Sequence, residues 1–378
     1  MYENNASKIL FVFGTRPEAI KFAPLIKEMK KYSKFNVKIV LTAQHREMLD
    51  QVLKFFKISG DYDLDLMKPG QDLFSITNSA MNGLKEIFIN ENPDLVFVQG
   101  DTTTVFAGAL SAYYLKIPVA HLEAGLRSHD LYSPFPEEGN RILTGHIAKI
   151  HFCPTEKAAD NLKAEGINKN IHIVGNTVID ALLMAKNSIE NNNDLNKEIF
   201  DYFRDIISDS KKTILITGHR RESFGKPFLD ICNAIKELSK KYKEVNFVYP
   251  VHLNPNVQEP VNKILGNIQN VYLIKPLDYP KLVWLMNRSY LVLTDSGGIQ
   301  EEAPALGKPV LVIRDVTERK EGLEAGTAKL VGTDKNNIIN EVSTLLNDPS
   351  EYNKMANAIN PYGDGTSSRK ICEILLDD

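Results

Sequence analysis

The sequence predicts an α/β protein built from two doubly wound domains, and three observations support this fold class. Short and uniformly apolar runs recur along the chain, as expected for parallel strands that are covered on both faces. Segments with helical periodicity follow these runs, so strands and helices alternate. The length of 378 residues corresponds to two or three domains.

The first half of the chain contains five apolar runs that we expect to be strands. They are Ile9–Phe13, Val37–Leu41, Leu95–Val98, Val119–Leu122 and Ile171–Val174. The expected helices between them are Pro17–Tyr32, Met48–Phe56, Phe74–Ile89, Val105–Leu115 and Glu138–Ala148. Pro17 favours a helix start, because a proline at the first helical position lacks only an N–H that would be unpaired there.

A polar, asparagine-rich stretch near Asn187–Asn196 interrupts this alternation and indicates a connection at a domain edge. A second series of apolar runs follows it. The expected strands are Ile214–Thr217, Phe247–Tyr249, Val271–Ile274, Leu291–Thr294 and Val310–Ile313. The expected helices are Pro227–Lys240, Leu282–Asn287, Ile299–Leu306 and a last one at Ser367–Leu376. We therefore expect one domain over residues 1–180 and a second over residues 181–360.

Composition argues against several classes of protein. The 45 Lys and Arg residues balance 48 Asp and Glu residues, and basic and aromatic residues do not alternate, so we expect no nucleic-acid partner. The 3 cysteines are far apart, and no His/Cys cluster has metal spacing, so we expect neither disulfides nor a metal. The N-terminus is polar and no apolar stretch reaches about 18 residues. We therefore expect a cytoplasmic protein without a signal peptide or membrane span.

Polar residues follow the apolar runs in both halves of the chain. Ligands of open parallel sheets bind beyond the carboxyl ends of the strands, so these positions predict a site. The segments are Gly14–Glu18, Gln99–Thr104, Glu123–Arg127, Thr217–Glu222, Pro250–His252 and Asp295–Gly298. Two such edges that face each other would form a cleft, which places the expected site between the domains.

The segment Ser296, Gly297 and Gly298 is the best candidate for a phosphate-binding turn. It directly precedes a predicted helix, whose free N–H groups point at an approaching anion. The alternative is a serine that caps the helix after a tight turn. Glu302 lies one turn into the same helix and could hold a ribose hydroxyl pair or complement the helix dipole. The sequence has no G-x-x-x-x-G-K-[ST] and no G-x-G-x-x-G after a strand, which argues against P-loop hydrolysis and a nicotinamide cofactor.

Several charged residues at these positions are candidates for chemistry. Arg16 precedes Pro17 at a strand-to-helix turn, where its guanidinium could grip a diphosphate. Lys21 opposes the dipole of the same helix, which hints at an anionic ligand. The carboxylates Asp101, Glu123 and Glu137 and the histidine His219 together suggest proton transfer. Each of these residues alone also has a simpler structural interpretation as a cap or a surface charge.

Seven motifs, in order, closely resemble the non-hydrolysing bacterial UDP-N-acetylglucosamine 2-epimerases. They are Gly14–Lys21, Gly100–Thr104, His121–Arg127, Pro134–Glu138, Gly175–Asp180, Gly218–Ser223 and Asp295–Glu302. The likeness extends from about Ile9 to the Pro361–Gly365 segment. The resemblance implies the B-type glycosyltransferase fold, in which two Rossmann-like domains face each other across a cleft. In that fold the C-terminal helix returns to the first domain, so residues 361–378 are assigned there.

The resemblance also implies a reaction. It is the reversible C2 epimerisation of UDP-GlcNAc to UDP-ManNAc, by anti elimination of UDP to 2-acetamidoglucal and syn re-addition, supplying ManNAc-type sugars for surface polysaccharide. The implied enzyme is a cytoplasmic homodimer without a metal or other cofactor, and it binds UDP mainly on its second domain.

The resemblance assigns roles to individual residues. The implied acid/base set is Asp101, Glu123 and Glu137, and His219 assists at the departing phosphate. The implied nucleotide-sugar contacts are Arg16, Lys21, Ser296, Gly297, Gly298, Glu302 and Arg319. A second UDP-GlcNAc site with an allosteric role would use Gln44, Arg220 and His252.

Three alternative functions stay open at this point. A B-type glycosyltransferase shares the fold but transfers the sugar to an acceptor. A hydrolysing epimerase releases free ManNAc and UDP. A catalytically silent sensor would bind the nucleotide sugar without turning it over.

Overall fold

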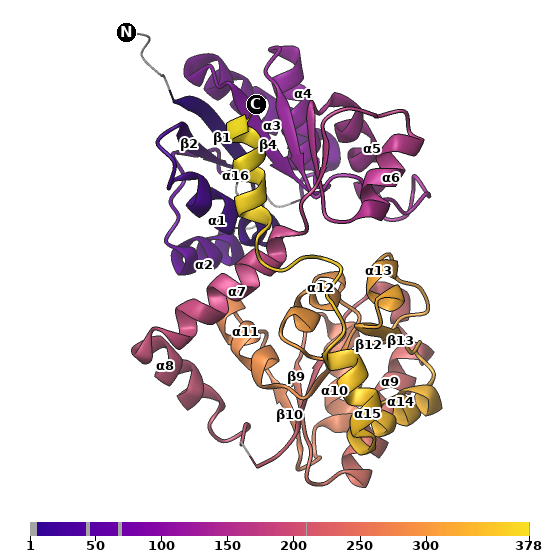
Figure 1. Ribbon diagram of the computed structural model, residues 1–378. Helices are drawn as coiled ribbons and strands as arrows, with labels where there is room; N and C mark the ends of the chain where they lie inside the picture. The colour runs from indigo at the N-terminus through magenta and orange to yellow at the C-terminus, as the bar shows by residue number, and fades with distance from the viewer. Residues whose placement is uncertain (1–5, 43–45, 67–69, 209, 378) are drawn as a thin grey trace. The chain divides into compact units, whose positions relative to one another are not determined.

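The computed structural model describes residues 6–42, 46–66, 70–208 and 210–377 and contains two parallel β-sheets (Figure 1). The chain divides into two compact units. Unit 1 comprises the residues up to Ala181 and from Tyr362 onward, and unit 2 comprises Leu182–Pro361. Each unit alternates strands with helices, and its neighbouring strands are parallel. The predicted α/β fold class with two doubly wound sheets is confirmed.

Unit 1 has a seven-stranded sheet in the order β3-β2-β1-β4-β5-β6-β7. Its strands are β1 (Ser7–Phe13), β2 (Phe35–Leu41), β3 (Tyr62–Asp63), β4 (Leu95–Gln99), β5 (Val119–Leu122), β6 (Ile150–Cys153) and β7 (Ile171–Ile173). Its helices are α1 (Arg16–Met29), α2 (Arg46–Phe56), α3 (Leu73–Glu91), α4 (Thr103–Tyr114), α5 (Glu137–Ile147), α6 (Glu156–Ala164) and α16 (Ser367–Asp377), together with the start of α7 (Thr177–Glu190). The strand order reverses between β1 and β4, and ligands of such sheets bind at this switch point.

Unit 2 has a six-stranded sheet in the order β10-β9-β8-β11-β12-β13, which reverses between β8 and β11. Its strands are β8 (Thr213–Thr217), β9 (Asn246–Pro250), β10 (Val271–Ile274), β11 (Leu291–Thr294), β12 (Val310–Val312) and β13 (Ala328–Leu330). Its helices are the rest of α7, α8 (Asn193–Phe203), the 3-10 turn η1 (Arg221–Ser223), α9 (Lys226–Lys241), α10 (Pro255–Leu265), α11 (Tyr279–Arg288), α12 (Gly297–Ala305), α13 (Lys320–Glu324), α14 (Lys335–Asn347) and α15 (Pro349–Ala356).

The core of unit 1 shows why its central strands are uniformly apolar. Side chains of a strand alternate between the two faces of a sheet. Leu10 and Val12 of β1 pack into a cluster with α3 and α4 on one face. Phe11, on the other face, stacks on Phe97 of β4, with ring centroids 4.9 Å apart. Both faces are therefore buried, and each apolar residue of the run contributes to the core.

The C-terminal segment belongs to unit 1 for specific reasons. The Asn176 N–H donates to the carbonyl oxygen of Tyr362 at 2.7 Å. The buried Asp180 carboxylate accepts from the N–H of Ser368 at 2.8 Å at the start of α16, which packs against α1 (Figure 1). The last helix is thus tied to unit 1 through hydrogen bonds to a buried carboxylate. The position is favourable because the N-terminus of a helix stabilises a nearby anion.

The interpretation of Asn187–Asn196 as a connection was wrong for most of its length. Helix α7 continues to Glu190, and α8 begins at Asn193. The side chain of Asn192 accepts from the N–H of Leu195 and caps α8, so an asparagine in this stretch serves as a helix cap. The change from unit 1 to unit 2 falls inside α7, after Ala181.

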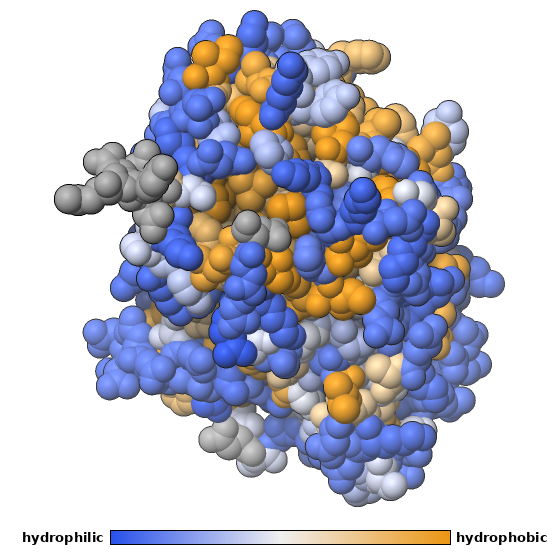
Figure 2. Space-filling model, turned by 45° about the horizontal axis from the view of Figure 1, so that its top comes forward, coloured by the Kyte–Doolittle hydropathy of each residue, from blue (hydrophilic) through white to orange (hydrophobic). Residues whose placement is uncertain are grey.

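Polar residues dominate the face drawn in Figure 2, with apolar residues gathered in patches between them. The large apolar side chains exposed in the structure include Phe74 of α3, Tyr113 and Tyr114 of α4, and Tyr132 and Phe135 before α5. Within the described residues, no helix is both long and apolar enough to cross a membrane.

Candidate functional site

Glu123 follows β5 at the carboxyl edge of the unit 1 sheet, and three side chains hold its carboxylate. Lys21 of α1 donates from Nζ to Oε1 at 2.6 Å. The amides of Gln99 and Asn176 donate to Oε2 and Oε1, the latter at 2.9 Å. Glu123 is only 8% exposed, so its negative charge is balanced locally by a cation and two amide donors.

The local backbone explains how Glu123 reaches this position. Its φ of +62° lies in the left-handed region, which turns the chain sharply after β5. Gly125 follows with φ +87°, and a Cβ there would stand 2.1 Å from the carbonyl oxygen of Ala158. Only glycine fits this approach, so the turn that presents Glu123 depends on Gly125.

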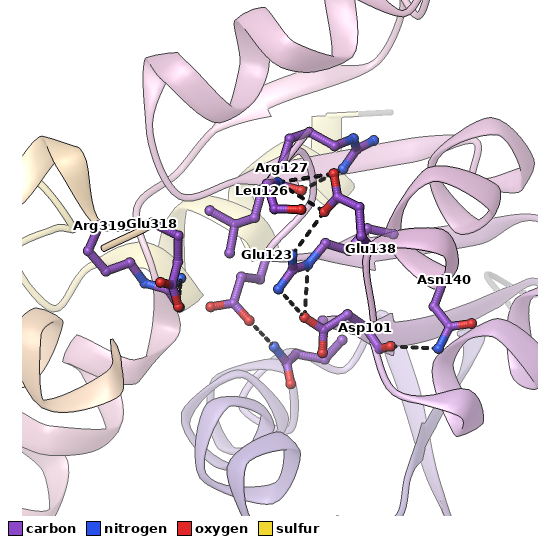
Figure 3. Close-up of polar contacts among 12 residues, drawn as sticks. Asp101, Glu123, Leu126, Arg127, Glu138, Asn140, Glu318 and Arg319 are labelled. Carbon is purple, nitrogen blue, oxygen red and sulfur yellow. Dashed lines mark hydrogen bonds and ion pairs between the residues drawn. The ribbon is translucent and has the colours of Figure 1, made fainter. Parts of the chain in front are cut away.

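Asp101, at the carboxyl end of β4, is held by α5 (Figure 3). Arg141 donates from Nε to Asp101 Oδ2 at 2.9 Å and from Nη1 to Glu138 at 3.0 Å. The amide of Asn140 donates to the main-chain oxygen of Asp101 at 2.9 Å. The side chain of Asp101 is 27% exposed, so one guanidinium fixes this carboxylate while solvent still reaches it.

Glu137 and Glu138 have different environments at the start of α5. Glu138 is 1% exposed and accepts from the N–H groups of Ser128 and His129. Burial raises the pKa of Glu138, but these hydrogen bonds and Arg141 outweigh burial and hold the pKa below its ordinary value. Glu137 is half-buried, and its Oε2 has no hydrogen-bond partner within the described residues. The carboxylate of Glu138 is therefore used in hydrogen bonds within the protein, whereas Oε2 of Glu137 is available to accept a hydrogen bond or a proton from a ligand.

The loop with Arg16, after β1, is joined to the loop with Asp101 by Glu18. The buried Glu18 carboxylate accepts from the N–H groups of Gly14 and Thr15, at 2.8 and 2.7 Å. It also accepts from the hydroxyl of Thr102 at 2.6 Å. Burial raises the pKa of Glu18, although these donors oppose the shift. The two loops of the switch point are thus fixed to one another.

His121 supports the same edge from inside the sheet, as a core residue. Its Nε2 lies 2.7 Å from the carbonyl oxygen of Gly100, to which it donates, directly before Asp101. Burial lowers the pKa of His121 to about 4, so the imidazole is neutral near pH 7.

In unit 2, His219 follows β8 and lies next to Asp295, which follows β11. The N–H groups of His219 and Arg220 donate to Asp295 Oδ2 at 2.6 and 2.8 Å. The His219 ring stacks on His252 with centroids 5.0 Å apart, and its Nδ1 lies 3.5 Å from Asp295 Oδ1. Burial lowers the pKa of His219, and the Asp295 carboxylate opposes that shift. The side chain of His219 is 43% exposed, so it remains accessible to a ligand.

The start of α12 has the form expected of an anion-binding turn. Ser296 is the N-cap residue but makes no side-chain cap hydrogen bond. Gly297 and Gly298 form the first helical positions, so these two residues place no side chain of their own over the backbone there. Glu302, one turn on, is buried and accepts from the hydroxyl of Tyr279 at 3.1 Å.

Arg319 lies beside this turn. Its Nε donates to the buried Glu301 carboxylate of α12, and its guanidinium stands 3.5 Å from the place of a Cβ on Gly297. The N–H of Arg319 donates to the Thr317 hydroxyl at 3.1 Å. Helix α12 and the loop after β12 thus fix a cation at the helix start.

The structure therefore brings the predicted residues together in two groups. In unit 1, Arg16, Lys21, Asp101, Glu123 and Glu137 lie at the carboxyl ends of β1, β4 and β5 or at the helix starts that follow. In unit 2, the grouped residues are His219, Arg220, His252, Ser296, Gly297, Gly298, Glu302 and Arg319. Gln44 lies outside the described residues. The described residues contain no group of three or more His, Cys, Asp or Glu that could hold a metal ion.

The sequence predicted no individual role for several residues at these edges, although four of them lie in the segments or motifs given above. They are Gln99, Arg141, Asn176, Asp295, Glu301 and Arg314. Gln99 and Asp295 share a signal, because each is a polar residue directly at the end of an apolar run. Arg141 and Glu301 lie in helices and carry no such signal.

Comparison with known proteins decides the family. The profile of the family described as UDP-N-acetylglucosamine 2-epimerase matches residues 27–376. The chain belongs to this family. The epimerase of Escherichia coli K12 is 56% identical over 369 residues, which cover 97% of this chain and 98% of that protein. Six of the seven motifs lie within the matched residues, and only Gly14–Lys21 precedes them.

Solved structures of epimerases agree with this family. A crystal structure of UDP-GlcNAc 2-epimerase from Neisseria meningitidis bound to UDP-GlcNAc superimposes with a TM-score of 0.92. It is 51% identical, and the match covers 98% of this chain and 100% of that one. A structure of S. aureus MnaA with UDP has a TM-score of 0.87 at 44% identity, with 98% and 96% of the chains covered. Both relatives bind the nucleotide part of the substrate that the sequence resemblance implies.

Proposed function

We propose that this chain is a non-hydrolysing UDP-GlcNAc 2-epimerase, which interconverts UDP-GlcNAc and UDP-ManNAc. The observation that carries the proposal is the Glu123 carboxylate, which Lys21 and two amides hold at the carboxyl edge of the unit 1 sheet. A fixed, nearly buried carboxylate at a ligand edge is suited to move a proton. The glycine turn of α12 with Arg319 is suited to bind a diphosphate. An epimerase of this kind needs both capabilities.

The C2 proton of the sugar has no neighbouring carbonyl, so simple deprotonation would form an unstabilised carbanion. In the proposed route a carboxylate removes that proton while the C1–O bond to UDP breaks, leaving 2-acetamidoglucal and UDP. The addition reverses these changes: a proton reaches C2 on the other face and a UDP oxygen rejoins C1. We assign the proton transfers to Asp101, Glu123 and Glu137, and we place His219 at the departing phosphate.

Non-hydrolysing chemistry requires that glucal and UDP recombine, so water must not intercept the sugar. The first motif, with Arg16, Pro17 and Glu18, resembles that of the non-hydrolysing branch, which supports this part of the proposal. Glu18 holds the Arg16 loop through Gly14 and Thr15. Arg16 is thereby positioned to retain the diphosphate after the C1–O bond breaks.

Proton NMR of UDP-GlcNAc with the enzyme in deuterated water tests the proposal. We expect UDP-ManNAc to appear with deuterium at C2 and without an acceptor, and traces of glucal and UDP to accumulate later. Product that keeps its original C2 hydrogen would exclude elimination. Accumulation of free ManNAc with UDP would indicate the hydrolysing reaction, and absence of turnover without an acceptor would favour a glycosyltransferase.

We further propose that UDP-GlcNAc binds a second time, at Arg220 and His252, and activates the enzyme. His252 stacks on His219 and Arg220 follows it, so a ligand on either residue would act on the His219 loop. Such coupling is typically about 1–3 kcal/mol. Reactions started from pure UDP-ManNAc should lag until UDP-GlcNAc is added, and His252→Ala should weaken this response. Immediate full turnover would contradict required activation.

The remaining family features are proposals of the same kind: a cytoplasmic homodimer that supplies ManNAc-type sugars for surface polysaccharide. The exposed aromatic pair of α4 supports association, since Tyr113 and Tyr114 are 59% and 66% exposed. Sedimentation should give twice the chain mass of 42.5 kDa. If the sedimenting species at micromolar concentration has the mass of a single chain, the homodimer is contradicted.

A further inference from the structure

A carboxylate of unit 2 lies where the proposed function needs a phosphate. The Oε1 atom of Glu318 is 3.5 Å from the place of a Cβ on Gly297, at the first helical position of α12. Helix N-termini attract anions, and the glycine turn leaves room for one. Glu318 comes from the loop after β12 and not from α12 itself, so its presence there depends on that loop.

Two arginines hold Glu318 in this position, as they would hold a phosphate. Arg314 donates from Nη1 to Oε2 at 2.9 Å, and Arg319 Nη1 lies 3.5 Å from Oε1 (Figure 3 shows Glu318 beside Arg319). Arginine forks bind carboxylates and phosphates with the same geometry. A carboxylate and a phosphate therefore compete for these donors.

Each of the two arginines also forms an ion pair with a carboxylate other than Glu318. Glu318 itself is more exposed than either arginine. Arg319 also donates to Glu301, which is 2% exposed on its side chain, and Arg314 donates from Nε to Glu222 at 2.6 Å. The arginine side chains are 11% and 9% exposed, against 33% for Glu318. If Glu318 swung outward, both guanidinium groups would stay in place.

The competitor carries its charge under all working conditions. Burial raises the pKa of Glu318, but the surrounding arginines, Arg319 first, lower it to about 2. An incoming diphosphate therefore meets an ionised carboxylate.

We propose that Glu318 is an internal competitor for the phosphate site: its carboxylate occupies the position of a ligand phosphate and must leave when a diphosphate binds. This rests on the proposed function, because it assumes that the α12 turn binds the UDP diphosphate. Glu318 keeps the two arginines paired and aligned, and its displacement weakens the net affinity for UDP. Glu318 is thus a residue that sets how tightly the nucleotide is held.

Calorimetric titration of the full-length chain with UDP tests this proposal. We expect Glu318→Gln to lower the UDP dissociation constant at least fivefold, because the variant removes the competing charge while keeping the shape. Glu237→Gln is the control: it also removes one carboxylate that is paired with a cation, Lys335, and is 52% exposed, but it lies on α9 outside every segment assigned to the site, and it should change the constant less than twofold. The gain should also appear with inorganic pyrophosphate and should be absent with uridine.

The outcomes separate the two proposals. Wild-type chain that binds no UDP would contradict the proposed function. Wild-type binding with equal or weaker binding by Glu318→Gln would overturn the competitor and leave the proposed function intact. If Glu318→Gln does not fold, Glu318→Asp takes its place: it keeps the charge but withdraws it from Gly297, and we expect a tightening of about twofold or more. Unchanged or weaker binding by that variant would equally overturn the proposal.

Discussion

Unit 1 and unit 2 share the order of six strands, to which unit 1 adds a seventh, but they hold charged groups at their carboxyl edges in different ways. In unit 1 the groups at the edge include carboxylates beside Arg16, and cations and amides hold these carboxylates, as Lys21 holds Glu123. In unit 2 the groups at the edge include cations, and carboxylates hold them, as Glu301 holds Arg319. The same arrangement of strands therefore yields one edge suited to proton transfer and another suited to a diphosphate.

The loops after the central strands are braced in related ways. After β4, the carbonyl of Gly100 accepts from His121 on the neighbouring strand. After β8, the carbonyl of Gly218 accepts from the hydroxyl of Tyr249, also on the neighbouring strand, at 2.7 Å. Both braces are side chains of otherwise apolar runs. The comparison indicates that both sheets hold the loops at their carboxyl edge in place in the same way. A few side chains then determine what each edge binds.

The largest expected effect is on turnover in unit 1. Glu123→Gln keeps the shape of the side chain but removes the proton acceptor, so kcat should fall at least about 100-fold. Glu91→Gln is the control, because Glu91 ends α3 ahead of β4 and thus lies at the opposite edge of the sheet. An NMR assay of both variants measures this. Near-normal turnover by Glu123→Gln would remove Glu123 from the acid/base set.

His219→Asn should lower turnover by a similar factor of about 100, because in the proposed reaction its imidazole assists the departing phosphate. Substrate binding should change much less, so the loss should appear in kcat and not in KM. His172→Asn in unit 1 provides the control, since His172 lies on β7, the edge strand of that sheet. A loss confined to KM would make His219 a binding residue only.

Gly297→Val should weaken UDP binding at least about tenfold, which corresponds to roughly 1.4 kcal/mol. Its side chain would fill the space beside Arg319 and Glu318, because even a Cβ at this position would lie 3.5 Å from atoms of both residues. Gly297→Ala should have a smaller effect, and titration calorimetry ranks the two variants. Normal binding by Gly297→Val would place the phosphate elsewhere.

A smaller effect is expected on acid stability, and it should differ between the units. Burial lowers the pKa of both His121 and His151 in unit 1 to about 4. As the pH falls below about 6.5, both imidazoles become protonated in the unfolded chain before they do in the folded chain. The free energy of unfolding therefore decreases between about pH 6.5 and pH 4. At pH 5 each histidine contributes a loss of about 2 kcal/mol.

Hydrogen exchange at pH 7 and pH 5 checks this difference. Amides of β5 and β6 should lose more protection in acid than those of β8 and β11. His121→Gln keeps a donor for the Gly100 carbonyl and should flatten the pH dependence of unit 1, whereas His172→Gln should not. Equal acid sensitivity of the two units would show that the buried histidines do not govern it.

The parts of the fold that could be predicted are those with a purely local cause. Leu95–Val98 is a strand because each of its residues is buried on one face or the other, and an apolar run reports this directly. Strand β6 was missed because His151 interrupts its apolar run, although the residue is 1% exposed. Strand β13 has only three residues and includes a lysine, so its pattern is too short to detect.

The site was predictable in its residue types but not in its pairings. The sequence places Glu123 and Lys21 at neighbouring element ends, and Lys21 was interpreted as a ligand contact. In the structure its Nζ binds Glu123, 102 residues away in the chain. Glu318 carries no signal in the sequence, because its position depends on a loop that returns to the start of α12. Such contacts are tertiary and leave no periodic trace in sequence.

The central claim is that unit 1 carries the proton chemistry and that unit 2 provides most of the binding of the diphosphate. Titration of the Glu123→Gln variant with UDP tests this division most directly. The account predicts a UDP dissociation constant within about threefold of the wild-type value, since backbone donors at a helix start bind phosphate without the help of Glu123. A loss of UDP affinity of about tenfold or more, in a variant that is still folded, would contradict it.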